Sequence, residues 1–186
     1  MPATRLVGLL RAVNVGGRSL PMSALRNVVA GLGHRDVVTF IQSGNVVFTT
    51  DRPARTVAQR DAIGADIERA LDTEAGLRTS VMVRTAAELR AAIDAMPFAA
   101  DEPNRSRLMV VFLAGKPTAQ GIGRLEPDRF APDRFEVAGR EMFVHYPNGA
   151  GRSKFNGAYY DKRLGVAGTA RNLNTVAKLA DLADAC

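Results

Sequence analysis

The feature that most constrains the fold of this chain is the order of its strand-like and helix-like segments. Two β-branched runs, at 37–41 and 46–50, are joined by Gln42-Ser43-Gly44-Asn45, a strong hairpin signal. The neighbouring segments predict a strand at 5–15, a helix at 21–32, a helix at 54–74 and a strand at 79–84. The resulting strand–helix–strand–strand–helix–strand order is that of the ferredoxin-like unit.

The same order of segments recurs in the second part of the chain. The expected elements are a strand at 107–114, a helix at 118–125, strands at 135–138 and 142–146, a helix at 153–164, a strand at 166–170 and a last helix at 172–183. We therefore predict an α+β protein of two ferredoxin-like (βαββαβ) halves with antiparallel sheets and an extra C-terminal helix. The predicted boundaries are 1–84 for the first half, 85–106 for a helix and connector, and 107–186 for the second half with the C-terminal helix.

Cysteine usage and hydropathy indicate the compartment. Cys186 is the only cysteine of the 186 residues, so the chain has no intramolecular disulfide. No stretch reaches the roughly 18 apolar residues that a membrane span needs. The apolar run at 6–10 is too short for a secretion signal. We expect a cytoplasmic protein without a membrane partner. Because the chain has two histidines and no Cys/His cluster, we expect no metal and no cofactor.

The charge of the chain favours anionic partners. It carries 25 Lys and Arg against 19 Asp and Glu, a formal net charge of +6. Such a balance is typical of proteins that bind nucleic acid or phosphorylated metabolites. The basic residues are spread along the chain without a run of five or six, so a compositional origin of the charge stays an alternative.

Two polar segments of the first half contain more hydrogen-bonding groups than a turn needs. In one, Arg11 and Asn14 interrupt an apolar strand, and Gly16-Gly17-Arg18 follows just before a helix. Such a glycine pair lets backbone N–H groups approach an anion, although a tight strand-to-helix turn explains it equally. The other segment is the hairpin turn Gln42-Ser43-Gly44-Asn45, which the geometry of the turn also explains.

Two segments of the second half have the same character. Asn148, Gly149, Gly151, Arg152, Ser153 and Lys154 lie between a strand and a helix. Glycines, two cations and a helix start favour a phosphate site, with an ordinary loop capped at Ser153 as the alternative. Tyr146 and Arg152 stand where a P-loop has its first glycine and its lysine, so we predict no ATPase. The last segment holds Arg171, Asn172 and Asn174 before the final helix, where one asparagine is explained as a helix cap.

These segments resemble the hallmarks of a bacterial family, the domain-of-unknown-function 1697 family. The similar stretches are LLRAVNVGGRSLPMSAL (9–25), TFIQSGNVVF (39–48), YPNGAGRSKF (146–155) and TARNLNTVAKLADLA (169–183), spread over essentially the whole chain. One departure is Ala12, where the family often has glycine. The resemblance implies a pair of ferredoxin-like halves, and it brings no established activity, cofactor or catalytic residue.

Our leading hypothesis is that these loops converge on one cleft that binds an anionic or phosphorylated small molecule, or the end of a nucleic acid. Two alternatives stay open: an enzyme that acts on a phosphorylated substrate, and a protein-interaction module. The enzyme needs a general acid or base in the cleft, for which His145 or an acidic residue are the candidates. The sequence contains no recognisable catalytic motif and does not indicate an oligomeric state.

Overall fold

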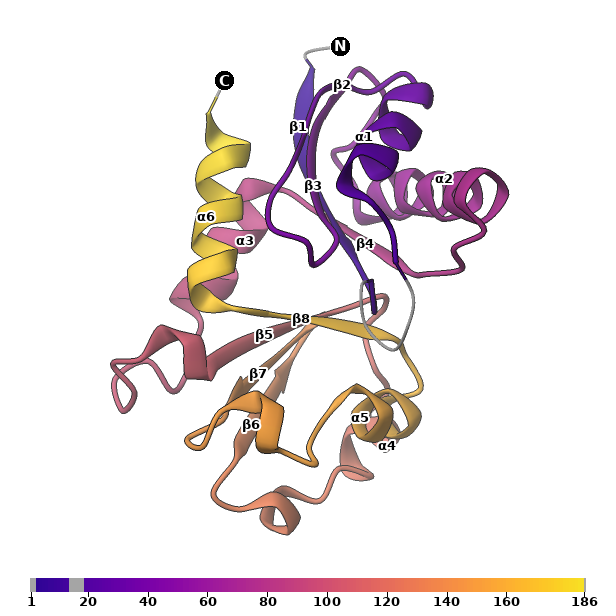
Figure 1. Cartoon of the computed structure of the whole chain (residues 1–186). Coiled ribbons are helices and arrows are strands. Elements are labelled where there is room, and N and C mark those ends of the chain that lie inside the picture. The colour runs from indigo at the N-terminus through magenta and orange to yellow at the C-terminus, as the bar shows by residue number, and fades with distance from the viewer. Residues whose placement is uncertain (1–2, 14–18, 186) are drawn as a thin grey trace. The chain divides into compact units, whose positions relative to one another are not determined.

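Two units of the chain each contain a four-stranded antiparallel sheet with helices beside it (Figure 1). The computed structural model describes residues 3–13 and 19–185. The first unit is Met1–Leu89 with Lys178–Cys186, and the second is Arg90–Ala177. The sequence predicts other boundaries, namely 1–84, 85–106 and 107–186. They are drawn from the order of the strands and helices, whereas the two units are defined by contacts between residues, and they stay a prediction.

The first unit has the predicted order of elements. These are β1 (Thr4–Leu10), α1 (Met22–Gly31), β2 (Arg35–Thr39), β3 (Asn45–Thr50), α2 (Val57–Ala75) and β4 (Val81–Arg84). The strands lie in the order β2-β3-β1-β4. In the centre of the sheet β1 is antiparallel to both neighbours, with Leu6 opposite Phe48 of β3 and Leu9 opposite Met82 of β4.

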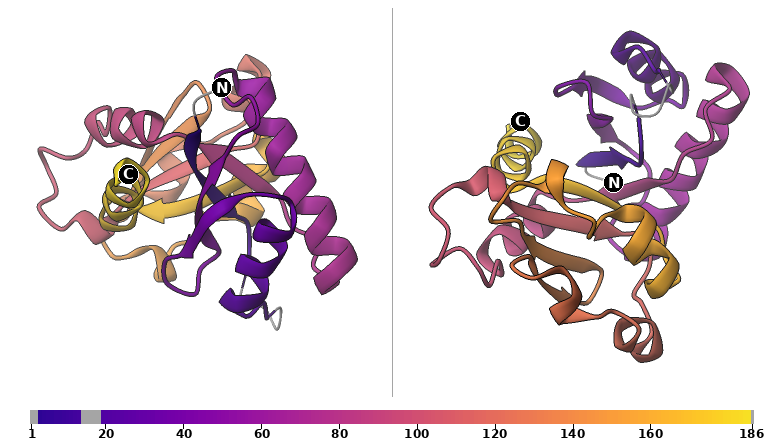
Figure 2. Two further views of the ribbon diagram at one scale, coloured as in Figure 1. Left: turned by 90° about the horizontal axis from the view of Figure 1, so that it is seen from above. Right: turned by 60° about the horizontal axis from the view of Figure 1, so that its bottom comes forward.

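Helices α1 and α2 pack on one face of this sheet, as two directions of view show (Figures 1 and 2). Their apolar stripes place Val29 of α1 and Ile63 of α2 in one core with Leu6 of β1. Each fully buried side chain of this size stabilises the fold by about 1.5–3 kcal/mol. The start of α2 is fixed by a capping box, in which Thr56 and Gln59 exchange side-chain and backbone hydrogen bonds.

The second unit repeats this arrangement. Its elements are β5 (Leu108–Leu113), α4 (Ala119–Gly123), β6 (Arg134–Ala138), β7 (Glu141–His145), α5 (Gly157–Leu164) and β8 (Gly168–Asn172), with short 3-10 turns η1 (Arg105–Arg107), η2 (Pro127–Phe130) and η3 (Ala150–Arg152). The sheet order is β6-β7-β5-β8, so each strand has the place of its counterpart in the first sheet. Two ferredoxin-like halves are thus confirmed.

Aromatic side chains form much of the core of the second unit. Phe155, which is 1% exposed, lies just before α5 and stacks on Phe135 of β6 at a centroid distance of 4.6 Å. It also contacts Tyr160 of α5 at 5.5 Å, and it packs with Met142 and Val144 of β7. Phe155 therefore joins the sheet to the helix beside the loop that contains Arg152.

Two further helices complete the chain, α3 (Ala86–Asp94) and the predicted C-terminal helix, α6 (Leu173–Asp184). Within the first unit, Arg5 of β1 donates a hydrogen bond from Nε to the carbonyl of Leu182 at 2.9 Å, which ties the end of α6 to the sheet. Among the helices in the described part of the chain, none has both the length and the apolar character to span a membrane.

Two element boundaries differ from the prediction by four residues or more, and each has a local cause. β1 ends at Leu10 rather than at residue 15, because Ala12 has a φ of 52°, which is incompatible with an extended strand. α5 begins at Gly157 rather than at residue 153, because the side chain of Asn156 accepts the N–H groups of Ala158 and Tyr159 and caps the helix there.

Candidate functional site

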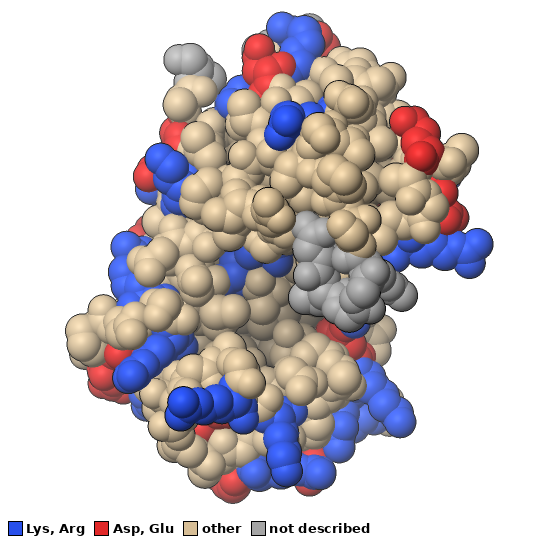
Figure 3. All heavy atoms as spheres, viewed as in Figure 1, with Lys and Arg blue, Asp and Glu red and all other residues tan. Residues whose placement is uncertain are grey.

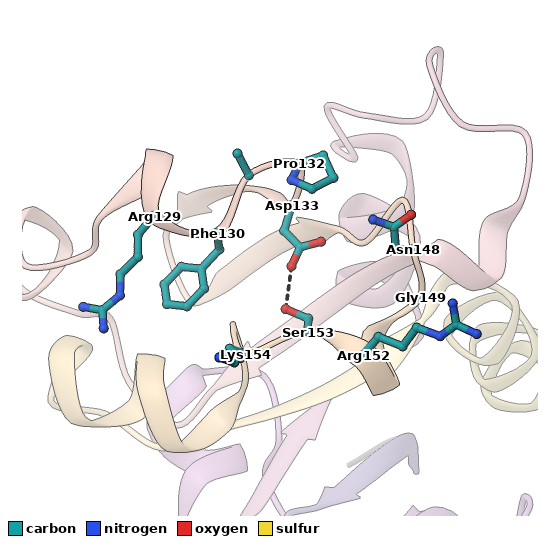
Figure 4. Close-up of a pocket in the computed structure, with 10 residues that line it drawn as sticks. Arg129, Phe130, Pro132, Asp133, Asn148, Gly149, Arg152, Ser153 and Lys154 are labelled. Carbon is teal, nitrogen blue, oxygen red and sulfur yellow. Dashed lines mark hydrogen bonds between the residues drawn. The ribbon is translucent and has the colours of Figure 1, made fainter.

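A cavity of about 450 Å³ lies in the second unit between two loops (Figure 4). One loop runs from η2 to β6 and the other from β7 to α5. The lining residues are Arg129, Phe130, Ala131, Pro132, Asp133, Asn148, Gly149, Arg152, Ser153 and Lys154. Small-molecule sites in proteins span roughly 300–1,000 Å³, so this volume suits a metabolite-sized ligand.

Two cations line the cavity without a charged partner. Arg152 lies at the end of η3 and Lys154 follows two residues later, and both are exposed. Neither side chain makes an ion pair or hydrogen bond with any residue that the structure describes. The second unit contains thirteen Lys and Arg against nine Asp and Glu, which is +4 of the chain's net +6. Figure 3 shows Lys and Arg side chains gathered over this unit.

The one carboxylate of the lining is Asp133, which contacts Ser153. The Ser153 hydroxyl donates to Oδ2 of Asp133 at 2.5 Å and accepts the backbone N–H of Phe155 at 2.8 Å. In Figure 4 this pair lies in the middle of the lining, with Phe130 on one side and Arg152 on the other. Asp133 makes no ion pair within the described residues, although both cations line the same cavity.

A third cation, Arg129, is paired with a carboxylate outside the cavity. It pairs with Glu126 at 2.8 Å and lies over the ring of Phe130, 5.5 Å from its centroid. Glu126 also accepts hydrogen bonds from Tyr159 and Arg163. The hydrogen bond from Arg129, followed by those from the other two groups, holds the pKa of Glu126 below its ordinary value. Glu126 therefore neutralises Arg129, whereas Arg152 and Lys154 have no ion-pair partner among the described residues.

The loop that carries these cations is fixed at its start by Tyr146. The buried Tyr146 hydroxyl donates to the carbonyl of Phe155 at 2.7 Å, and burial raises the pKa of this phenol. The N–H of Gly149 donates to the carbonyl of Tyr146 at 2.9 Å, with a φ of 84° that favours glycine. The Gly149 amide therefore donates its hydrogen bond within the loop. The side chains of Arg152 and Lys154, in contrast, have no hydrogen-bond partner among the described residues.

His145 lies immediately before this loop but does not line the cavity. It is 6% exposed, and Nη2 of Arg134 lies 3.2 Å from its Nδ1. Because a guanidinium only donates, Nδ1 accepts, and the proton on Nε2 donates to Glu102 at 3.1 Å. Hydrogen bonds from His145 and from the Asn104 N–H hold the pKa of Glu102 below its ordinary value. Both ring nitrogens of His145 thus have hydrogen-bond partners within the fold, which indicates a structural role.

The predicted segments of the first unit lie next to each other. The N–H of Leu10 donates to the carbonyl of Gly44 at 2.8 Å, which places Arg11 beside the hairpin turn. Asn45 is fully buried, and its amide donates to the carbonyl of Phe40 and to the hydroxyl of Ser43. Asn45 therefore holds the turn together. Gln42 is exposed in the same turn, whereas the predicted Asn14, Gly16, Gly17 and Arg18 lie outside the described residues.

The predicted residues around β8 are used within the fold. Arg171 is 7% exposed and donates to the hydroxyl of Thr169 at 2.7 Å and to the carbonyl of Ala170 at 2.8 Å. Burial lowers the pKa of Arg171 to about 10. Asn172 caps α6 by accepting the N–H of Thr175, as one reading of the sequence expects, and Asn174 is exposed in the first turn. None of these residues lines the cavity, and neither does Gly151.

The sequence-based list missed the wall formed by residues 129–133. Two prolines and two aspartates at 127–133 indicate a turn, which is a weak signal for a binding site. Asp133 becomes part of the cavity through Ser153, 20 residues further along the chain. No local pattern predicts a contact between two loops of this kind.

The chain is similar to a known family in sequence and to a solved structure in fold. The model of the family described as "Protein of unknown function (DUF1697)" matches residues 3–143, which ends before the loop with Arg152. The conserved bacterial protein SP0830 from Streptococcus pneumoniae is 20% identical, with a TM-score of 0.65 over 98% of this chain and 100% of that chain. At this identity the likeness shows a shared fold. No curated protein matches. The match over residues 3–143 places the chain in the DUF1697 family.

Proposed function

We propose that the cavity of the second unit binds an anionic small molecule, with a phosphorylated metabolite as the ligand class. The observation that carries this proposal is the pair Arg152 and Lys154, both exposed, both lining a cavity of about 450 Å³, and both without an ion-pair partner among the described residues. A guanidinium binds phosphate or carboxylate oxygens through two parallel N–H groups, and an ammonium adds a point charge. The net charge of +4 in this unit adds attraction over a longer range.

The cavity contains only some of the residues that the sequence predicts for the binding site. Five of the predicted site residues line it: Asn148, Gly149, Arg152, Ser153 and Lys154. The segments around Arg11 and Gln42 belong to the first unit, and their convergence on the same cleft stays a prediction. Binding of a nucleic-acid end and a cytoplasmic location also stay predictions. The enzyme alternative gains a candidate acid or base in Asp133, the carboxylate that lines the cavity.

Thermal unfolding of the full chain with a panel of anions tests the proposal. The panel contains inorganic phosphate, phosphosugars, nucleotides, polyphosphate and short oligonucleotides, each at low and moderate salt. A ligand at about 100 times its Kd raises the unfolding free energy by about 2.7 kcal/mol, which shifts the midpoint by several degrees. We expect such a shift for at least one phosphorylated class, with a smaller shift at higher salt.

Two variants locate the effect. Arg152→Ala removes a cavity cation and is expected to reduce the shift strongly. Arg124→Ala removes an exposed arginine of the same unit that does not line the cavity, and it is expected to keep the shift. Equal shifts in both variants, or no shift for any anion with the wild type, would contradict the proposal.

A further inference from the structure

The cavity contains a carboxylate that a purely anionic ligand does not explain. Asp133 lines the same cavity as Arg152 and Lys154, yet it pairs with neither cation. An anion that fills the cavity must therefore approach a negative charge. This arrangement is unfavourable unless the ligand also offers hydrogen-bond donors to that carboxylate.

Asp133 has acceptor capacity for such donors. An ionised carboxylate has about four lone-pair positions, and the hydroxyl of Ser153 uses one of them. The backbone N–H of Asp133 donates to the carbonyl of Phe130 at 2.9 Å, which fixes the residue at this place in the loop. The amide of Asn148, also in the lining, adds a donor and an acceptor.

The size and the lining of the cavity also favour a ligand that is larger than a phosphate ion. Its volume of about 450 Å³ is larger than one phosphate ion needs and falls in the range of small-molecule sites. Phe130, Ala131 and Pro132 also line the cavity, and they offer apolar surface to carbon atoms of a ligand. The lining thus provides cations at one part, an acceptor for hydroxyl groups at another, and an apolar wall.

We propose that the ligand is a hydroxylated phosphate ester, such as a sugar phosphate or the ribose phosphate of a nucleotide. Its phosphate contacts Arg152 and Lys154, and its hydroxyl groups donate to Asp133. This inference rests on the proposed anion site and adds the chemical class of the ligand.

Two esters of equal length isolate the hydroxyl groups. Glycerol 3-phosphate and propyl phosphate share the phosphate and the three-carbon chain, and the former carries two more hydroxyls. Calorimetric titration of the full chain is expected to give glycerol 3-phosphate an affinity about tenfold or more higher, since one hydrogen bond to a charged group contributes about 1.5–3 kcal/mol. Equal affinities for the two esters would overturn the inference. If neither ester nor inorganic phosphate binds, the anion site itself is refuted.

Substitution of the carboxylate provides the second arm. Asp133→Asn removes the negative charge, so propyl phosphate is expected to bind as well or better, and the preference for glycerol 3-phosphate to fall below about threefold. Asp128→Asn, at an exposed carboxylate outside the lining, is expected to leave the preference unchanged. Circular dichroism confirms that each variant is folded. A preference that persists in Asp133→Asn overturns the inference.

Titrations with ribose 5-phosphate and adenosine 5′-monophosphate distinguish the two sources of this chemistry. Tighter binding of ribose 5-phosphate assigns the site to free sugar phosphates, and tighter binding of the nucleotide assigns it to nucleotides. Binding of both more weakly than propyl phosphate would contradict the proposed ligand class.

Discussion

The hydroxyl of Ser153 donates a hydrogen bond to Oδ2 of Asp133 at 2.5 Å and so joins the two loops that form the cavity. Replacement of Ser153 by Ala leaves the Phe155 N–H and the carboxylate without this partner. We expect Ser153→Ala to lower the unfolding free energy by about 1 kcal/mol in denaturant titrations. Ser153→Thr keeps a hydroxyl and is expected to lose less. Equal stabilities of Ser153→Ala and the wild type would show that the contact does not hold the loops together.

Gly44 is expected to be intolerant of a side chain for two reasons. Its φ is 74°, and an added Cβ would lie 2.8 Å from the Cβ of Leu10 and 3.2 Å from that of Val13. We predict that Gly44→Ala lowers the unfolding free energy by roughly 2–4 kcal/mol, the sum of backbone strain and overpacking. Gly139→Ala is the matched control, because Gly139 has a φ of 63° with nothing within 4 Å of an added Cβ. That variant should lose only the backbone part, about 1–2 kcal/mol, and equal losses would refute the contact with Leu10.

Ala12 tests backbone strain in the opposite direction, because here a side chain is removed at a residue with positive φ. It has a φ of 52° at an exposed position. Ala12→Gly is expected to raise the unfolding free energy by about 0.5–1 kcal/mol, because strain relief exceeds the added flexibility of the unfolded chain. The same substitution at exposed Ala62, within α2, should lower stability by about 1 kcal/mol. Chemical denaturation of both variants checks the opposite signs, and a loss of stability in Ala12→Gly would argue against the φ at this position.

His34 gives the fold a dependence on pH. It is 4% exposed, and the centroid of its ring lies 4.6 Å from that of Phe48. Its Nε2 has no hydrogen-bond partner among the described atoms. Burial, followed by the charge of Arg52, lowers the pKa of His34 from 6.5. Just below pH 6.5 the unfolded chain therefore binds more protons than the folded protein.

The His34 contribution to the unfolding free energy should fall as the pH falls from about 6.5 through the lowered pKa. His34→Phe keeps a ring against Phe48 and removes the titrating group. We expect the stability difference between this variant and the wild type to grow in favour of the variant between pH 8 and pH 5. A difference that stays constant over this range would show that His34 titrates alike in both states.

The sequence predicted the order of elements because each strand and helix has its own periodicity. The capping box at Thr56 and the glycine of the hairpin turn are further signals that depend only on neighbouring residues. The start of α5 was predicted too early, because Ser153 and Asn156 are both good caps and only the packing of Phe155 between them distinguishes the two. Local chemistry thus fixes which elements form, and tertiary contacts fix where they begin.

The sequence singles out one of the two loops that line the cavity, and the binding site itself stays a prediction. The loop with Arg152 and Lys154 stands out in the sequence because glycines and cations gather there, whereas Asp133 lies in an unremarkable turn. Arg171 looked like a cation available to a ligand, but β8 buries its side chain against Thr169. A sequence shows which residues have polar chemistry, but not which of them the fold turns inward.

The most direct test of the anion site is a ¹H–¹⁵N correlation spectrum of the full chain during titration with inorganic phosphate. The cavity predicts saturable shifts of the amide signals of Asn148, Gly149, Ser153 and Asp133, which all line it. A variant with both Arg152→Ala and Lys154→Ala is expected to lose these shifts, whereas Arg124→Ala keeps them. Spectra that do not change, or changes confined to signals of the first unit, would contradict an anion site between these two loops.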